Sequence, residues 1–230
     1  MKKISYSQYS MWAQCPHRWK TAYIDDKREF KESIHTLFGT SMHEVIQAFL
    51  TVMYEDTAKA AEALPLKEML RIRMKRNYEQ AMIKNGGEEF CTQKDMVEFY
   101  EHGLLILEFI KKKRAQYFSK KGYELVGIEV PLEYDLPNGV KFIGYIDVVI
   151  RDTVRDVIKI YDIKTSTMGW NKWQKADKIK TDQLLLYKQF YSKQFNHPMD
   201  KIEVEYFIVK RKLYENLDFP QKRVQKFTPA

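Results

Sequence analysis

The chain has 230 residues, with 39 basic and 31 acidic side chains and a formal net charge of +8. This length favours a single domain with a core of ordinary size, and the balanced composition excludes long disordered or collagen-like segments. No run of about 18 apolar residues occurs, so the sequence predicts no membrane span and no membrane partner. The excess of positive charge favours a polyanionic partner, with nucleic acid as the first candidate.

The two cysteines, Cys15 and Cys91, are too few for a disulfide scaffold or for a four-thiolate metal site. The N-terminal residues lack the apolar core of a secretory signal peptide. Both features predict a protein of the reducing cytoplasm.

A first helix is expected over residues 7–23, with Ser5 or Ser7 as its N-cap. Its aromatic residues recur at helical spacing and form a stripe along it. These residues are Tyr9, Trp12, Trp19 and Tyr23.

A second helix is expected to start at Ser41, because Ser41 and Glu44 match a capping box and apolar residues then recur every three or four positions. Residues 58–120 predict two or three further helices, separated by Pro65 and by residues 85–87. The basic residues expected on exposed faces of these helices are Arg71, Arg73, Lys75, Arg76 and residues 111–114.

After Gly122 the apolar pattern changes to a period of two, which predicts strands. The expected strands span residues 125–134, 140–151, 157–164 and 203–210, and a helix at 181–195 precedes the last of them. The sequence Leu136-Pro-Asn-Gly139 predicts a hairpin between the first two. The fold class is therefore α/β, with a mixed sheet made of an antiparallel meander and a further strand, flanked by helices.

Two of these apolar strands carry carboxylates, which are costly to bury unless they are paired or bind a metal. Asp162 and Lys164 are two residues apart and so share a strand face. A four-residue turn between the strands pairs Ile150 with Lys159. Asp147 then falls opposite Asp162, with Cβ atoms about 5 Å apart, where the two charges repel unless a cation such as Mg²⁺ or Mn²⁺ lies between them. The alternative is a buried ion pair of Asp162 with Lys164 and a separately hydrogen-bonded Asp147.

The set of Asp147, Asp162 and Lys164 resembles the signature of the PD-(D/E)XK nuclease superfamily, in its RecB-like branch. Other matches occur in the expected order, and the resemblance covers nearly the whole chain. They are Ser5-Tyr-Ser7 with Cys15-Pro16, Gly39-Thr-Ser-Met-His43, Gly144-Tyr-Ile-Asp147 and Gln183-Leu-Leu-Leu-Tyr187. The resemblance implies a restriction-endonuclease-like core in one domain, residues 1–230, with a helical insertion at about 55–120.

The resemblance also implies a metal site for Mg²⁺, or Mn²⁺, formed by His43, Asp147, Asp162 and the main-chain carbonyl of Ile163. Lys164 would position or help to deprotonate the attacking water, or stabilise charge on the phosphate. His43 is expected in the first turn of its helix, where the dipole lowers the pKa of the imidazole; the alternative is a packed core histidine. Relatives with an Fe–S cluster need three more cysteines near the C-terminus, so no cluster is expected.

Glu129 is a further candidate catalytic carboxylate, and its position depends on the hairpin. A two-residue turn at Asn138-Gly139 pairs Val130 with Asp147 and points Glu129 away. A three-residue loop of residues 137–139, with Gly139 in the left-handed conformation, sets Glu129 opposite Asp147 and is the favoured alternative.

Gln183 and Tyr187 are four residues apart and share a helix face, from which both can contact a phosphate; the alternative is that Tyr187 packs in the core. The segment between Lys164 and Gln183 interleaves lysines with tryptophans, as single-strand channels do, although each tryptophan can equally anchor the loop. Its candidate nucleic-acid-binding residues are Thr165, Trp170, Lys172, Trp173 and Lys175. The lysine-rich runs at 111–114 and 172–180 contribute a DNA groove only if they flank the metal site.

The sequence therefore predicts a Mg²⁺-dependent deoxyribonuclease, with DNA as its partner. Exonuclease action on linear or single-stranded ends, in recombination, repair or DNA processing, is the first expectation, and structure-selective endonuclease action is the second. A nucleic-acid-binding subunit that does not cut, or a metal-binding interaction module, are the alternatives from other classes. A recombination or helicase partner and a bacterial or phage host would fit by analogy.

Overall fold

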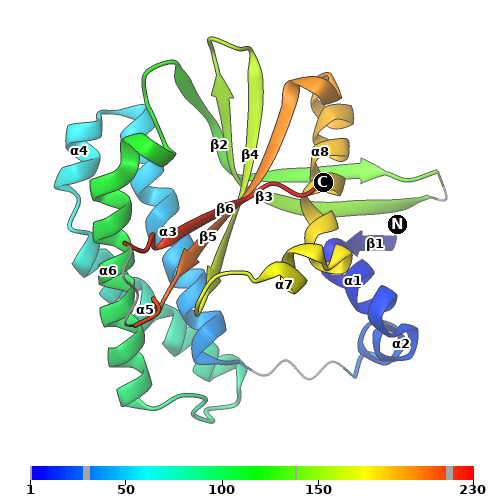
Figure 1. The fold of residues 1–230 in the computed structure, drawn as a ribbon. Coiled ribbons are helices and arrows are strands. Elements are labelled where there is room, and N and C mark those ends of the chain that lie inside the picture. Colours follow the sequence, from blue (N-terminus) through cyan, green and yellow to red (C-terminus); the bar gives the residue numbers. More distant parts are fainter. Residues whose placement is uncertain (1, 28–31, 138, 216–219) are drawn as a thin grey trace.

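Figure 1 presents a computed structural model in which a twisted sheet lies between two groups of helices. It describes residues 2–27, 32–137, 139–215 and 220–230. The N-terminal half contains strand β1 (Lys2–Ser5), helices α1 (Tyr6–Gln14), α2 (Pro16–Tyr23), α3 (Ile34–Glu55), α4 (Ala58–Ala63), α5 (Leu66–Lys84) and α6 (Gln93–Tyr117). The C-terminal half contains β2 (Tyr123–Asp135), β3 (Val140–Asp152), β4 (Val157–Ser166), α7 (Lys172–Ala176), α8 (Lys178–Phe195), the 3-10 helix η1 (Met199–Lys201), β5 (Ile202–Lys210) and β6 (Val224–Phe227).

The single helix predicted over residues 7–23 is wrong, because the chain breaks into α1 and α2 at Cys15. Cys15 has an extended backbone, and its thiol accepts a hydrogen bond from the Arg18 N–H at the start of α2. Pro16 occupies the first position of α2, where its missing N–H costs nothing. Of the two predicted caps, Ser5 caps α1 by accepting from the Gln8 N–H.

The predicted start of a helix at Ser41 is also wrong. Helix α3 begins two turns earlier, where Ser33 accepts a hydrogen bond from the Thr36 N–H. Ser41 is buried within α3 and donates its hydroxyl to the Leu37 carbonyl. The predicted breaks at Pro65 and at residues 85–87 are confirmed, since α4, α5 and α6 are separated there.

The sheet has the order β1-β3-β4-β5-β6, and β2 pairs with β3 along nearly its whole length. The four predicted strands are confirmed within a few residues, whereas β1, β6 and α7 were not expected from the sequence. The predicted pair of Ile150 with Lys159 is also confirmed. Strands β4 and β5 are parallel, and α7 and α8 connect them.

Strand β3 has a gap in pairing along one edge. Because β2 occupies its other edge, β1 and β4 must share this one. Strand β1 pairs with β3 only as far as Ile143, and β4 pairs with it only from Val148 onward. Among the described residues, no strand pairs with Gly144–Asp147 on this edge, so β3 and β4 diverge there.

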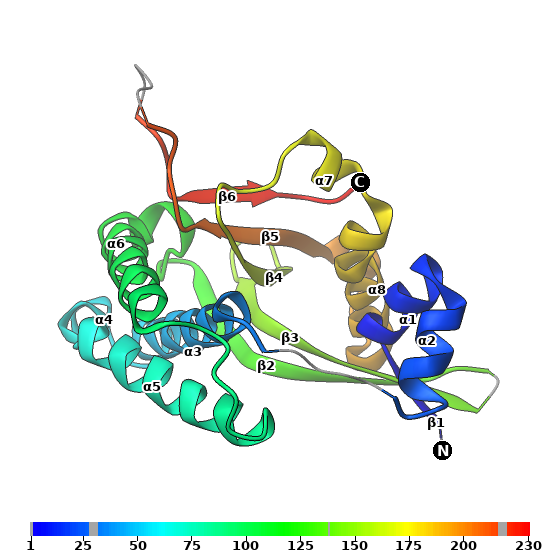
Figure 2. The same cartoon turned by 90° about the horizontal axis from the view of Figure 1, so that it is seen from below.

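Helices cover both faces of the sheet (Figure 2), and a hydrophobic core lies on each face. Helix α3 packs on one face, Tyr117 of α6 contacts Phe207 there, and α5 packs outside them on α3 and α6. Helix α8 packs on the other face, against residues such as Ile160 and Tyr206. Within the described ranges, no helix is long and apolar enough to cross a membrane. The divergence of β3 from β4 therefore opens between α3 and α8.

Candidate active site

Asp162 and Lys164 lie side by side on the face of β4 that points toward α8. The Asp162 side chain is buried, and Lys164 Nζ lies 3.0 Å from its Oδ1 and 2.7 Å from its Oδ2. Oδ2 nevertheless accepts no hydrogen bond of acceptable geometry from any residue that the structure describes. A buried carboxylate oxygen without a donor is an incomplete environment, which a further cation would complete.

Asp147 lies at the end of the gap in β3, where its side chain replaces strand pairing. Its Oδ2 accepts a hydrogen bond from the Ile163 N–H at 2.7 Å. The predicted position of Asp147 beside Asp162 is confirmed in outline, although the regular ladder stops at the preceding pair, Val148 with Tyr161.

The electrostatics of the site follow from two carboxylates sharing a buried location. Burial and the negative charge of Asp162 raise the pKa of Asp147 well above its usual range. For Lys164, burial alone would lower the pKa, but the charges of Asp162 and Asp147 outweigh it and raise the pKa above its usual value. Lys164 therefore stays protonated at neutral pH and offsets part of the carboxylate charge.

His43 reaches the same location from the opposite side, on α3. Its Nδ1 lies 3.6 Å from Asp147 Oδ2, and its ring lies close to the Ile163 main chain. The expectation that His43 lies in a first helical turn is wrong, since it is well inside α3. Burial, rather than the helix dipole, is the main cause that lowers the pKa of His43 and favours the neutral imidazole.

Glu129 on β2 lies opposite Asp147 and so joins this group. The pairs on either side, Ile128 with Val148 and Val130 with Ile146, set Glu129 opposite Asp147. This register is that of the favoured three-residue loop, in which Gly139 has a φ of +73°; Asn138 of that loop lies outside the described residues.

Gln47 connects Glu129 to the neighbouring strand. Its Nε2 donates to Glu129 Oε1 at 2.6 Å and to the Asp147 carbonyl at 3.3 Å. It is a buried polar residue one helical turn after His43, and that spacing was the available sequence signal.

Gln183 and Tyr187 share one face of α8, as predicted, and that face meets the site. Gln183 Oε1 accepts from Lys164 Nζ at 3.3 Å, while Gln183 Nε2 donates to the Tyr187 hydroxyl at 3.1 Å. The Tyr187 ring packs over Gly144, where an added Cβ would lie 3.1 Å from ring atoms. Gly39 allows a similar approach of α3 to β4, since a Cβ there would lie 3.2 Å from Thr165 Oγ1. The two glycines thus let the helices reach the strands that carry the carboxylates.

The segment after Lys164 contains one exposed and one buried tryptophan. Trp173 is 73% exposed on α7, with Lys172 Nζ 4.8 Å from its ring centroid. Trp170 is only 6% exposed and packs against Tyr206, so the prediction that it stacks on bases is wrong and it anchors the loop instead. Lys175 is half-buried and lies over the Phe227 ring.

Several other basic residues of the helices are paired with acidic ones. Arg76 and Arg73 bind Glu44 on α3, and Arg114 binds Glu62 at 2.7 Å. The cavity that contains Lys111 and Lys112 also contains Glu62 and Glu108 but no candidate site residue. The run at 111–114 therefore does not flank the proposed metal site.

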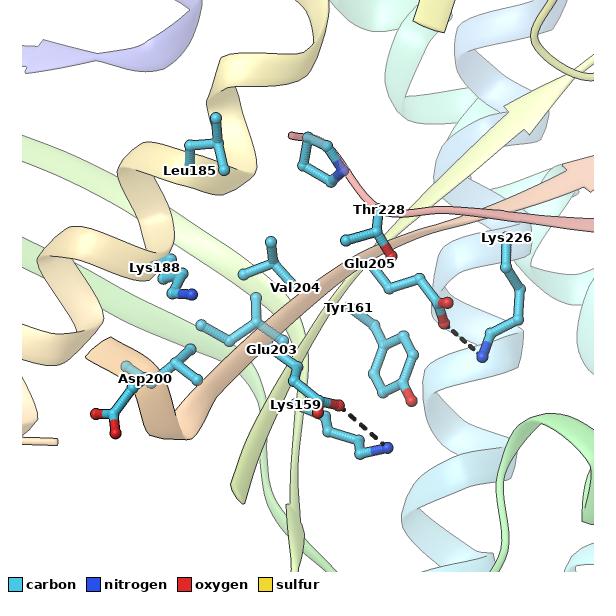
Figure 3. A pocket seen from close by; sticks show the side chains of 13 residues that line it. Lys159, Tyr161, Leu185, Lys188, Asp200, Glu203, Val204, Glu205, Lys226 and Thr228 are labelled. Carbon is cyan, nitrogen blue, oxygen red and sulfur yellow. Dashed lines mark ion pairs between the residues drawn. The ribbon is translucent and has the colours of Figure 1, made fainter. Parts of the chain in front are cut away.

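A cavity of about 480 Å³ lies at the N-terminal halves of β4 and β5 and contains none of the candidate residues (Figure 3). Four of its charged side chains are paired, Lys159 with Glu203 at 3.4 Å and Lys226 with Glu205 at 2.6 Å, and Lys188 and Asp200 also line it. Because its basic and acidic side chains balance, the cavity offers no concentrated charge for a substrate phosphate or a metal.

The donor set around Asp147 and Asp162 fits a hard divalent cation. It combines two buried carboxylates, one with an oxygen that lacks a donor, and the main chain of Ile163 next to His43. Within the described part of the chain, no three His, Cys, Asp or Glu side chains already form a metal-binding cluster. Lys164 contacts Asp162 and provides positive charge that balances part of the carboxylate charge.

Comparison with known proteins gives one family. A family model described as the PD-(D/E)XK nuclease superfamily matches residues 3–229, nearly the whole chain. A comparison with curated proteins gives no match.

Proposed function

The chain belongs to the PD-(D/E)XK nuclease superfamily, and we propose that it is a Mg²⁺-dependent deoxyribonuclease of the RecB-like branch that acts as an exonuclease on linear or single-stranded DNA ends. The observation that carries this proposal is the buried pair of Asp147 and Asp162 with Lys164 against it, at the divergence of β3 and β4. The ordered motifs at Gly39–His43 and Gln183–Tyr187 support the branch, because both surround this pair.

In the reaction, a water oxygen attacks phosphorus, the bond from phosphorus to one sugar oxygen breaks, and that oxygen leaves with a proton. Mg²⁺ or Mn²⁺ would be held by Asp147, Asp162, the Ile163 carbonyl and His43, and it would supply Lewis-acid polarisation of water and phosphate. Lys164 would donate to a phosphate oxygen and balance developing negative charge, or position the attacking water. Gln183 holds Lys164 in place from α8.

Exposed aromatic rings support a single-stranded substrate. Trp12 on α1 and Trp173 on α7 are both exposed, and both helices contact α8, which carries Gln183 and Tyr187. Unpaired bases stack on such rings without regard to sequence, while a paired duplex does not offer its bases.

The test is degradation of end-labelled linear single- and double-stranded DNA beside a covalently closed circle, each with Mg²⁺, with Mn²⁺ and with EDTA. The proposal expects metal-dependent loss of linear DNA and an intact circle. Cleavage of the circle would replace exonuclease by endonuclease action. Binding of DNA without cleavage under every metal would identify a non-catalytic subunit and overturn the proposal.

A further inference from the structure

A pocket of about 260 Å³ adjoins the candidate active site where β4 ends. Residues near the start of α3 line it, and so does Arg211, the first residue after β5. Its wall continues the active-site strand, since Thr165, Ser166 and Thr167 directly follow Lys164 and Ser166 lies about 7 Å farther along the chain. The pocket is therefore close enough to the active site for one bound polymer to occupy both.

The lining of this pocket is positive and rich in hydroxyl groups. It includes Lys180 from the first turn of α8 and Arg211 after β5, and none of its lining residues carries a carboxylate. The pocket is too small for a drug-sized ligand but several times larger than one water, which takes about 30 Å³ in the liquid. Its size and chemistry suit a single phosphate group.

Arg211 is the unusual member of this lining. It is 7% exposed, its guanidinium lies 3.9 Å above the Phe99 ring, and its NH1 donates to Glu98 at 2.9 Å. Its Nε is buried and has no hydrogen-bond partner among the described residues. Arg211 also lines the pocket, so its guanidinium places a positive charge beside any anion bound there.

The charge around Arg211 is not cancelled by Glu98. The same Glu98 oxygen also pairs with Lys212 at 3.0 Å, so one carboxylate serves two cations. Burial first, and then the positive charge of Arg211, lowers the pKa of the nearby His102, which is consistent with a positive local potential.

We propose that this pocket, lined by Thr165, Ser166, Thr167, Lys180 and Arg211, binds a phosphate group of the DNA strand adjacent to the one cleaved. The proposal rests on the proposed function for its ligand. The phosphate is either a terminal phosphomonoester or an internal phosphodiester, and the two sources are separable by changing the ends of the oligonucleotide.

The test measures binding of internally labelled single-stranded oligonucleotides by fluorescence anisotropy in EDTA, over a series of salt concentrations. The oligonucleotides carry a 5′-phosphate, a 3′-phosphate, or hydroxyl groups at both ends. Lys180→Ala removes one cation of the pocket. The matched control is Lys188→Ala, which removes the same charge from α8 at the separate cavity of Figure 3. Arg211→Lys keeps the charge and removes the planar guanidinium.

We expect Lys180→Ala to weaken binding several-fold and to lower the slope of log K against log salt by about 0.7, the value for one phosphate contact of a single strand. Lys188→Ala should leave both quantities near the wild-type values. Loss of a preference for one phosphorylated end identifies a terminal phosphate, and an equal loss for all three oligonucleotides identifies an internal one. Equal effects of Lys180→Ala and Lys188→Ala on binding would overturn the proposal that this pocket binds a phosphate.

Arg211→Lys should also weaken binding, but it touches the buried pair with Glu98, so Lys180→Ala decides the question if Arg211→Lys fails to fold. These measurements require neither metal nor cleavage. If the wild-type protein cuts no DNA but Lys180→Ala weakens binding, the proposed function is contradicted and the phosphate pocket is supported. If the protein cuts DNA but Lys180→Ala leaves binding unchanged, the pocket is contradicted and the proposed function stands.

Discussion

The Oδ2 atom of Asp147 accepts a hydrogen bond from the backbone N–H of Ile163 at 2.7 Å, across two strands that no longer pair. At the point where the pairing partner of β3 changes from β1 to β4, a side-chain oxygen thus accepts the hydrogen bond that a backbone carbonyl accepts in a regular sheet. The bond fixes a carboxylate within reach of Asp162 and holds the Ile163 main chain at the site. The break in the sheet and the candidate active site are therefore the same structural feature.

Replacing Asp147 by Asn should stabilise the metal-free fold while abolishing cleavage. Asn keeps an oxygen acceptor for the Ile163 N–H but removes a charge that burial and Asp162 oppose, as its raised pKa indicates. In EDTA at neutral pH we expect the Tm to rise by a few degrees, since about 1 kcal/mol corresponds to about 2–4 °C in a chain of this size.

Asp152→Asn is the matched control on the same strand. Hydrogen bonds from the Arg155 backbone, with smaller contributions from its neighbours, lower the pKa of Asp152, so its charge stabilises the fold and its removal should lower the Tm. Equal signs for the two substitutions would contradict the electrostatic account.

The effect of Asp147 should also depend on pH in a defined direction. Because its pKa is raised on folding, the folded state binds more protons, and the ionised carboxylate costs stability above the unfolded value of about 3.9. The gap in unfolding free energy between Asp147→Asn and wild type should shrink as the pH falls through the folded pKa. Denaturant titrations in EDTA at a series of pH values measure this gap. A gap that is constant with pH would mean that folding does not raise the pKa of Asp147.

His43→Ala should raise the Mg²⁺ concentration needed for half-maximal cleavage by about tenfold or more, because it removes a group 3.6 Å from Asp147. The comparison is His17→Ala, which removes an exposed histidine on α2. An unchanged Mg²⁺ requirement in His43→Ala would mean that His43 packs in the core and does not bind the metal.

Gly144→Ala should destabilise the protein and reduce activity, because the new methyl group would lie 3.1 Å from the Tyr187 ring. Overpacking of this kind costs about 1–3 kcal/mol. Measurement of Tm for Gly144→Ala alone, Tyr187→Leu alone and the double variant separates the causes. If the clash with Tyr187 is responsible, the cost of Gly144→Ala shrinks in the Tyr187→Leu background. An additive result would place the cost elsewhere.

The two tryptophans near the site should respond oppositely to replacement by alanine. Trp173→Ala should weaken binding to single-stranded DNA by about 1–3 kcal/mol per stacked base and leave the Tm unchanged, because the ring is exposed. Trp170→Ala should lower the Tm, because that ring is buried against Tyr206. Anisotropy and thermal unfolding on the same samples distinguish these effects, and an unchanged affinity in Trp173→Ala would exclude stacking there.

The parts of the fold that follow from local pattern were predicted correctly. Period-two runs and the hairpin signal fixed β2, β3 and β4, and from them the pair of Ile150 with Lys159. Because register is set by turn length, the three-residue loop also set Glu129 opposite Asp147. The convergence of the site residues was predictable for this reason.

The parts that depend on tertiary context were not predictable. Strand β1 has four residues and exists because β3 offers an edge, and the gap at Gly144–Asp147 depends on that pairing. Ser41 and Glu44 match a capping box. In the structure, however, Ser41 is buried and arginines bind Glu44, so both residues lie within α3 rather than at its start. Whether a tryptophan such as Trp170 is buried depends on β5 and β6, which the local sequence does not indicate.

The measurement that tests the central claim most directly is single-turnover cleavage of linear DNA in Mg²⁺ by Lys164→Ala and Lys159→Ala. Both lysines lie on β4, but Lys164 contacts Asp162, whereas Lys159 pairs with Glu203 at the distant cavity. We expect Lys164→Ala to reduce the rate by about 100-fold or more and Lys159→Ala to leave it near wild type. Cleavage by Lys164→Ala at the wild-type rate would contradict the assignment of this site.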